Sequence, residues 1–284
     1  MQHQSAVALA PTKVAERQVV HRNRASGHGP IARLMSPSDL GHYLKPFVFL
    51  DRVDADASIA RGVNIHPHSG IATVTVLTEG NLHFDKGDWG NGVLDYGGVE
   101  WMQAGRGIWH GDEFTPGSSP RFSGFQLWVA LPAALELGPA EWQFVPSRDT
   151  PAVGPARVIL GTYQGCRSPA RSFDGLNYLL VTLAPGAEWT YETPAGHEVG
   201  WLAVSHGALI ADEPFLGGDM IAFDKSAAPI PLRAGTEGAT FVLGSAVPHP
   251  HDLVLGYYSV HTSQQALDTG EKRIEEIRPS GARK

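Results

Sequence analysis

Short runs of β-branched and aromatic residues, separated by turns that contain glycine, proline or asparagine, recur along this chain at intervals of about ten residues. The clearest runs are residues 46–50, 71–77 and 124–130, followed by residues 178–183, 199–204 and 240–243. Runs of this length and spacing are typical of a β-barrel or β-sandwich. The chain also has 33 glycines and 21 prolines, scattered without a period, which can supply the turns. We therefore predict an all-β fold with few long helices.

The chain has 284 residues, which exceeds the usual single-domain range of about 100–200 residues, so we expect two domains. Residues 146–155 are rich in proline, serine and glycine and lack periodicity, as expected of a linker. Similar β patterns on both sides suggest a duplication. The boundaries that we expect are a flexible tail at 1–18, a first β domain at 19–146, a second at 147–262 and a helical tail at 263–284.

The end of the chain is the region with a helical pattern. Residues 262–265 have the Thr-x-x-Gln form of a capping box. An apolar stripe follows, which Gly270 interrupts, so that one helix or two short ones would fit. The stripe consists of Ala266, Leu267, Ile274 and Ile277.

Composition excludes several classes of protein. The formal net charge of −7 argues against a nucleic acid as a direct partner. A single cysteine, Cys166, rules out an intrachain disulfide. The sequence contains no run of 18 apolar residues and no charged-then-apolar amino terminus, which argues against membrane insertion or secretion. We expect a cytoplasmic protein.

Three histidines are the candidate chemical centre. His66 and His68 are two residues apart at the start of a β-branched run, residues 71–78, so in a strand both imidazoles project from one face. His110 follows a glycine-rich loop that could bring it beside them. Imidazole nitrogen is a preferred ligand of iron, zinc, copper and nickel. The residues alone leave two interpretations open, a metal site and packed core histidines.

Two motifs around these histidines resemble a known family. Residues 62–68, Gly-Val-Asn-Ile-His-Pro-His, are followed by a strand that ends at Gly80, and residues 98–110 read Gly-Val-Glu-Trp-Met-Gln-Ala-Gly-Arg-Gly-Ile-Trp-His. This pair resembles the metal-binding motifs of the cupin superfamily and, more narrowly, of the pirin family. The resemblance covers roughly residues 30–278 and includes residues 45–51 and, more weakly, 255–262.

The resemblance implies two cupin-type, jelly-roll β-barrels followed by a short helical segment. It also implies one metal ion, most often iron, in the amino-terminal barrel, and none in the carboxy-terminal barrel. By position the ligands would be His66, His68 and His110. Zinc, nickel, copper or manganese could take the place of iron, because such sites follow metal supply and the Irving–Williams order.

The family's fourth ligand is a glutamate two residues after the third histidine, and this chain has Asp112 there. Aspartate is one methylene shorter and reaches less far. Asp112 could bind the ion directly, orient a metal-bound water, or leave a three-histidine centre with open positions; we favour the last two together. Glu113 could replace the glutamate only if the loop shifts by one residue.

The resemblance implies two classes of function. The first is a quercetin 2,3-dioxygenase-type enzyme that takes a flavonol-like substrate and O₂, with a carboxylate at Asp112 or Glu113 as general base; the shorter Asp112 predicts weak or altered activity. The second is a metal- or redox-dependent regulatory protein that acts through a protein partner. A protein that binds no metal in the cell is a third alternative.

Other histidines and aromatic residues carry weaker signals. His83 and Trp109 could line a pocket, although a barrel interior must be filled in any case, which favours a packing role. His249 and His251 repeat the His-Pro-His pattern without a following glycine-rich motif, and we predict no second metal site there.

Overall fold

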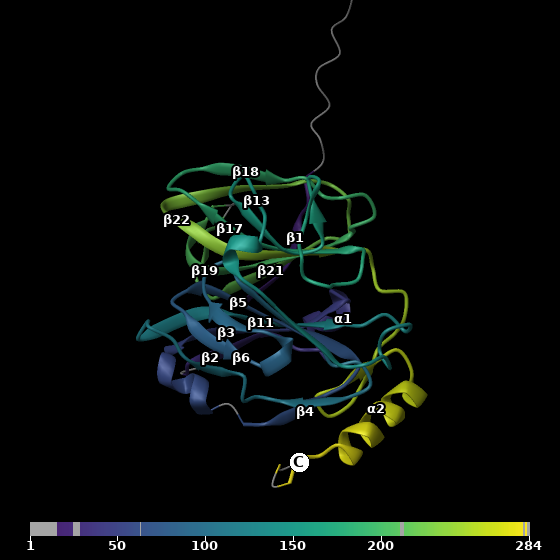
Figure 1. Cartoon of the computed structure of the whole chain (residues 1–284). Helices are drawn as coiled ribbons and strands as arrows, with labels where there is room; N and C mark the ends of the chain where they lie inside the picture. The colour runs from purple at the N-terminus through teal and green to yellow at the C-terminus, as the bar shows by residue number, and fades with distance from the viewer. Residues whose placement is uncertain (1–15, 25–28, 63, 211–212, 281, 283–284) are drawn as a thin grey trace, which may run out of the picture.

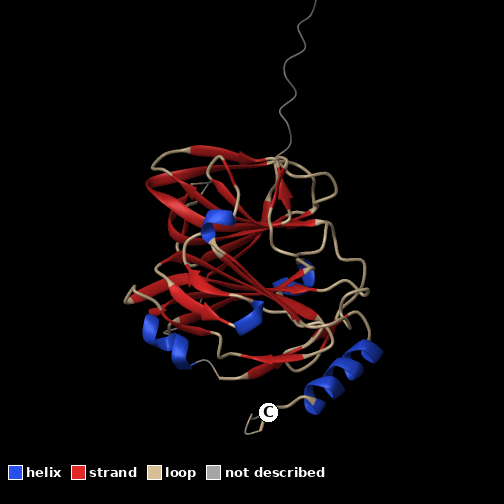
Figure 2. Cartoon of the chain, viewed as in Figure 1, coloured by secondary structure: helices blue, strands red, loops and turns tan. Residues whose placement is uncertain are grey.

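The computed structural model describes residues 16–24, 29–62, 64–210, 213–280 and 282. It confirms the predicted all-β fold of two cupin-type barrels with a short helical segment near the carboxyl end (Figures 1 and 2). The two barrels stack on each other. The blue ribbon of the first half lies below the green ribbon of the second half in Figure 1.

The N-terminal barrel is built on a six-stranded sheet with the order β12-β8-β5-β11-β3-β2. These strands are β2 (Ile31–Met35), β3 (Phe47–Asp56), β5 (Ile71–Glu79), β8 (Val99–Gln103), β11 (Arg121–Ala130) and β12 (Glu141–Val145). A three-stranded sheet, β10-β6-β7, and a two-stranded ribbon, β4-β9, complete it. Their bounds are β4 (His66–His68), β6 (Leu82–Asp85), β7 (Asn91–Leu94), β9 (Ile108–His110) and β10 (Phe114–Pro116).

The C-terminal barrel is built on a larger sheet, with the path β1-β21-β19-β22-β17-β14-β13 and with β18 and β20 attached at β22 and β19. The strands are β1 (Val19–Arg24), β13 (Ala152–Val153), β14 (Ala156–Leu160), β17 (Leu176–Leu183), β18 (Glu188–Tyr191), β19 (Val199–Leu209), β20 (Phe215–Leu216), β21 (Asp219–Phe223) and β22 (Ile230–Ala246). A small ribbon joins β15 (Thr162–Tyr163) to β16 (Cys166–Arg167).

The helices are few. Within the described ranges they are α1 (Leu40–Tyr43), α2 (Gln264–Glu276) and the 3₁₀ turns η1 (Ala57–Gly62), η2 (Gly87–Trp89) and η3 (Ser147–Asp149). The carboxy-terminal pattern forms one helix rather than two. Its N-cap is Ser263, whose side chain accepts a hydrogen bond from the Ala266 N–H, so the cap lies one residue later than the predicted capping box. No helix among the described residues has the length and apolar character needed to span a membrane.

An apolar core joins the two barrels. Strand alternation on β5 directs Val74 and Val76 toward the second barrel, where they belong to the same buried cluster as Leu180 and Trp201. The opposite faces of these N-terminal strands line the interior of their own barrel. The inward-facing side chains of β5, β8, β11 and β12 therefore determine whether that interior is apolar or polar.

The two ends of the chain cross between barrels, which the predicted boundaries did not anticipate. Residue 19 was expected to open the N-terminal domain, but β1 pairs with β21 in the C-terminal sheet. Residues 247–262, here called the C-terminal arm, return to the N-terminal barrel and carry β23 (Val254–Leu255) and β24 (Val260–His261). A parallel bridge joins Ser69 to Ser259. An edge strand can satisfy its backbone groups on either sheet, so its own sequence does not reveal its partner. Most of the expected tail, residues 1–18, lies outside the described residues.

Candidate metal centre

The β4-β9 ribbon brings the three predicted histidines together. The strands pair antiparallel with His66 opposite His110, and His68 projects from the same face as His66 because the two are at positions i and i+2 of the strand. The candidate ligand atoms of the three imidazoles all lie within 4.8 Å of one another. Two of the three side chains, His68 and His110, belong to residues that are 1% and 8% exposed. The ribbon therefore presents a compact group of nitrogen donors toward the barrel interior.

The hydrogen bonds of the imidazoles determine which nitrogen is free. Each Nδ1 lies within hydrogen-bonding distance of an oxygen that can only accept, so in the neutral ring the hydrogen is on Nδ1 and the lone pair is on Nε2. The bonds run from His66 to the carbonyl oxygen of Asn64 (2.7 Å), from His68 to that of Tyr258 (2.9 Å) and from His110 to the Glu113 carboxylate (2.8 Å). The Nε2 of His110 is buried without a partner within the protein. This donor set suits a transition-metal ion.

Burial favours the neutral form of two of the three imidazoles. It lowers the pKa of His66 and places that of His68 well below the usual value, and the nearby His110 acts in the same direction on both. At neutral pH both rings are therefore uncharged. A neutral imidazole is the form that binds a metal ion.

The two candidate carboxylates behave differently. Asp112 is exposed, and its carboxylate pairs with Lys86 at 2.7 Å instead of turning toward the histidines. Glu113 is only 4% exposed and accepts hydrogen bonds from His110 Nδ1 and from the Gly111 N–H (2.9 Å). Gly111 has a φ of +131°, a conformation that glycine adopts readily, and this turn brings the later residue back to the site. Of the two candidate carboxylates, Glu113 and not Asp112 therefore lies beside the histidines, where it contacts His110 Nδ1.

Glu113 is a fixed negative charge beside His110. Burial alone would raise its pKa, but the hydrogen bond and the electrostatic attraction of His110, with the hydrogen bond from the Gly111 N–H, outweigh burial and hold the pKa at about 2. Lys86 Nζ lies 3.8 Å from the same carboxylate. An anion at this distance supports the hydrogen on His110 Nδ1 and favours a cation on the other side of that ring.

The C-terminal arm contributes an aromatic residue that the sequence did not suggest. The Tyr258 ring lies 5.6 Å from that of His66 and 5.8 Å from that of His68, centroid to centroid, and its backbone φ is +56°. Beside it is a groove of about 350 Å³, whose walls include Phe49 and Trp128 from the barrel. The arm therefore forms one wall of an aromatic groove next to the histidines.

Hydrogen bonds among three buried side chains connect the C-terminal arm to the segment that follows His68. His261 Nδ1 lies 3.0 Å from the Glu136 carboxylate, and His261 Nε2 lies 2.9 Å from Ser69 Oγ. This order resembles a Ser-His-acid triad, but none of the three residues is more than 3% exposed, and a nucleophile must be reached by its substrate. We interpret these three residues as a structural link between the arm and the histidine site, because Ser69 directly follows His68 while His261 lies in the arm.

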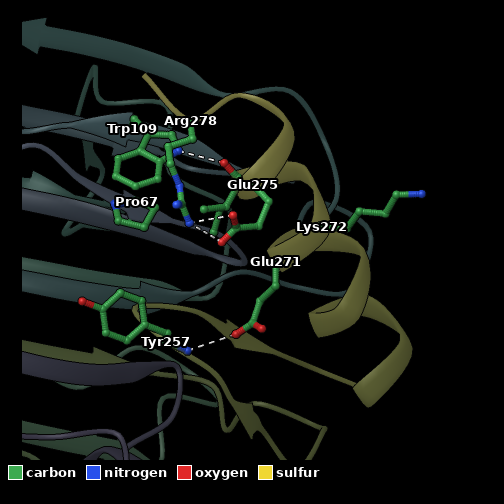
Figure 3. Close-up of a pocket in the computed structure, with 8 residues that line it drawn as sticks. Pro67, Trp109, Tyr257, Glu271, Lys272, Glu275 and Arg278 are labelled. Atoms are coloured by element: carbon green, nitrogen blue, oxygen red, sulfur yellow. Dashed lines mark hydrogen bonds and ion pairs between the residues drawn. The ribbon is translucent and has the colours of Figure 1, made fainter. Parts of the chain in front are cut away.

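The outer face of the ribbon is covered by α2 (Figure 3). Pro67 and Trp109 alternate with the histidines and point away from them, into a cavity of about 200 Å³ beside α2. The Trp109 indole N–H donates to the Ile274 carbonyl oxygen at 2.9 Å, and the Tyr257 N–H donates to Glu271 at 3.1 Å. Trp109 is half-buried in this cavity, so it neither lines the histidine site nor fills the barrel interior, which the packing interpretation had predicted.

The remaining histidines lie elsewhere. His83 is exposed on β6, so the packing interpretation of it was wrong. His249 and His251 lie on the arm with ring centroids 5.8 Å apart. Within the described part of the chain, the three histidines of the ribbon are the one group of three or more His, Cys, Asp or Glu residues placed to share an ion.

Comparisons of the sequence and of the structure with known proteins find the same group of similar proteins. The family model described as Pirin matches residues 30–129. A Pseudomonas aeruginosa protein named "Putative quercetin 2,3-dioxygenase" is 29% identical over 265 residues, which cover 87% of this chain and 90% of the relative. A crystal structure of quercetin 2,3-dioxygenase from Acinetobacter baumannii superimposes with a TM-score of 0.80 at 25% identity, covering 92% of this chain and 98% of that one. The bacterial pirin YhhW from Escherichia coli, solved with nickel(II), shares the fold with a TM-score of 0.60 at 20% identity, covering 82% and 98%.

Proposed function

Because the chain belongs to the pirin family of cupin proteins, we propose that it is a metal-dependent oxygenase of the quercetin 2,3-dioxygenase type. The observation that carries the proposal is the state of the three histidines. Each Nδ1 is bound to an acceptor, and the three rings converge from one ribbon with their Nε2 atoms free. Relatives named for the reaction with quercetin point to a flavonol-like substrate and O₂.

His66, His68 and His110 would hold one ion, and iron is the metal that we propose. Three imidazoles suit iron, zinc, nickel or copper, and three protein donors leave positions open for other ligands. An iron ion supplies Lewis-acid and redox chemistry toward an aromatic substrate and O₂. Within the protein, Glu113 and the carbonyl oxygens of Asn64 and Tyr258 would fix the direction of the three rings.

For the two candidate carboxylates we propose other roles than the sequence suggested. Both oxygens of Glu113 already accept hydrogen bonds, and its pKa of about 2 makes it a weak base. We propose that Glu113 orients His110 and that Asp112, paired with Lys86, takes no part in the site. Without a free carboxylate base at either position, turnover should be slower than in relatives that have one.

Oxygen consumption by the iron-loaded protein with quercetin tests this function. The His110→Ala variant should lose turnover, whereas His251→Ala, an exposed histidine on the arm, should keep it. Full iron occupancy with no oxygen uptake would reject the enzyme and favour the regulatory alternative. Less than about a tenth of an equivalent of any transition metal in protein purified without a histidine tag would reject both.

A further inference from the structure

A tyrosine with a strained backbone lies beside the histidine group. Tyr258 has a φ of +56°, in the left-handed region, where a residue with so large a side chain is rarely found. It belongs to the tight turn between β23 and β24, in which the Gly256 N–H donates to the Ser259 carbonyl oxygen at 2.9 Å. Glycine or asparagine is the usual residue in this conformation. The turn therefore does not account for the tyrosine side chain.

Burial does not account for it either, because Tyr258 is 40% exposed. Its carbonyl oxygen accepts the hydrogen bond from His68 Nδ1 at 2.9 Å, but a residue of any type can supply a carbonyl oxygen. Strained backbone positions are concentrated at functional sites, where the strain serves to place a group. The ring of Tyr258 is the group that this turn places.

The ring lies where the groove of about 350 Å³ meets the histidine group. Its centroid is 5.6 Å from that of His66 and 6.2 Å from that of Trp128. Trp128 in turn lies 4.7 Å from His68 and stacks on Phe49 with centroids 4.0 Å apart. Tyr258, Trp128 and Phe49 all border the groove. A molecule that fills the groove and reaches the histidines would therefore contact the Tyr258 ring.

The walls of the groove favour a planar aromatic group. Leu255 and Tyr257, which also line it, are 44% and 53% exposed, and exposed apolar side chains gathered in one place mark binding sites. Aromatic walls bind a planar ring through stacked or edge contacts. A cavity of about 150 Å³ holds benzene, so this groove has room for a substituted ring. The charged side chain of the lining, Arg33, is paired with Asp51, so charge contributes little.

We propose that Tyr258 is a specificity-determining residue that holds one aromatic ring of the substrate in this groove while the oxygen atoms of another ring face the histidine group. This inference rests on the proposed function and deepens it, because it assigns the substrate at least two rings. The strained turn presents the Tyr258 ring to the groove and to the histidines together. The ring and the carbonyl oxygen of Tyr258 thus have separate roles, in binding the substrate and in orienting His68.

Ligand binding to the zinc-loaded protein separates these roles, since zinc has no redox chemistry of its own. The two ligands are quercetin and maltol, a hydroxypyrone with neighbouring keto and hydroxyl oxygens on its single ring. Tyr258→Gly removes the side chain, keeps the carbonyl oxygen and suits the left-handed backbone. Its dissociation constant for quercetin should rise roughly tenfold, whereas those for maltol and zinc should stay within about twofold of wild type. Tyr258→Phe, which keeps a ring, should bind quercetin as wild type does.

A second left-handed residue provides the matched control. Gln164 has a φ of +45° and lies in the turn between β15 and β16 of the other barrel, so Gln164→Gly relieves similar strain away from the groove. This variant should bind both ligands with wild-type affinity. Tyr258→Asn, which also suits the left-handed region, removes the ring in a second way should the glycine variant fail to fold. The midpoint of urea unfolding monitors folding in each variant.

The outcomes distinguish this inference from the proposed function. Unchanged quercetin affinity in Tyr258→Gly and Tyr258→Asn would overturn the role of the ring while the oxygenase proposal stands. A parallel loss of quercetin, maltol and zinc would also overturn that role, because the effect would then act through His68. No quercetin binding to the zinc-loaded wild type would overturn both this inference and the flavonol-like substrate.

Discussion

The two barrels share an architecture but fill their interiors in opposite ways. In the C-terminal barrel Tyr163 and Tyr191 stack with ring centroids 5.0 Å apart, and Phe241 is fully buried in the same cluster. In the N-terminal barrel, three histidines and Glu100 occupy inward-facing positions. A cupin-type barrel therefore does not by itself make a site, because the residues at the inward positions decide whether it is packed or chemically active.

Two buried histidines, His197 and His110, show the same difference. In the C-terminal barrel Ser245 Oγ lies 2.7 Å from the Tyr191 hydroxyl and 2.8 Å from His197 Nδ1, and Asn177 donates to the same tyrosine. These groups satisfy one another, so the histidine is a packed residue. In the N-terminal barrel His110 is held at Nδ1 by Glu113, but its Nε2 is buried without a partner within the protein, which is where an ion can bind.

The largest expected effect concerns the buried acid of the N-terminal barrel. The pKa of Glu100 is raised to about 8 from 4.5, so the folded state holds a proton that the unfolded state has lost between these values. Its contribution is full below about pH 4.5 and is lost as pH rises to about 8, at about 1.4 kcal/mol per pH unit, or roughly 5 kcal/mol in all. Glu100→Gln should remove this slope in urea unfolding measured across pH 5–8. Equal slopes in both proteins would contradict the buried, neutral state.

A substitution in the packed barrel should act on stability alone. Phe241→Ala removes a fully buried ring and should lower the free energy of unfolding by about 3–5 kcal/mol. Zinc affinity, measured well below the unfolding temperature, should stay at the wild-type value. A variant that keeps its stability but loses zinc would break the contrast between the barrels.

His68→Ala should do the opposite: it should weaken metal binding and have little effect on stability. Loss of one of three donors should weaken zinc binding by more than about 100-fold, which exceeds the usual effect of removing a residue that supports a ligand. Chelator competition measures the affinity, and His197→Ala in the other barrel is the matched control. Equal losses in the two variants would mean that the effect is on folding and not on ligation.

The neighbouring carboxylates give the smallest and most specific effect. Glu113→Gln removes the negative charge that holds His110 and should weaken zinc binding by about 10–100-fold. Asp112→Asn removes only the contact with Lys86 and should leave the affinity unchanged. The reverse result would indicate that Asp112 lies at the ion, as its position two residues after the third histidine implies.

The sequence revealed the features that depend on residues close together in the chain, and it did not reveal contacts between distant residues. Alternation along a strand is local, so the shared face of His66 and His68 was visible, as was the strand rhythm of the barrels. Contacts between residues far apart in the sequence produce no comparable pattern. The acceptor for His68 is Tyr258, 190 residues away, and β1 joins the far sheet. The shift from Asp112 to Glu113 had one visible signal, the glycine at position 111 that permits the turn.

The most direct test is a crystal structure of the metal-loaded protein, with the element identified by anomalous scattering. The account predicts one ion at about 2.0–2.2 Å from the Nε2 atoms of His66, His68 and His110, with Glu113 still bound to His110 Nδ1. Ligation through an Nδ1 atom or by Asp112, or an ion bound away from the β4-β9 ribbon, would contradict it.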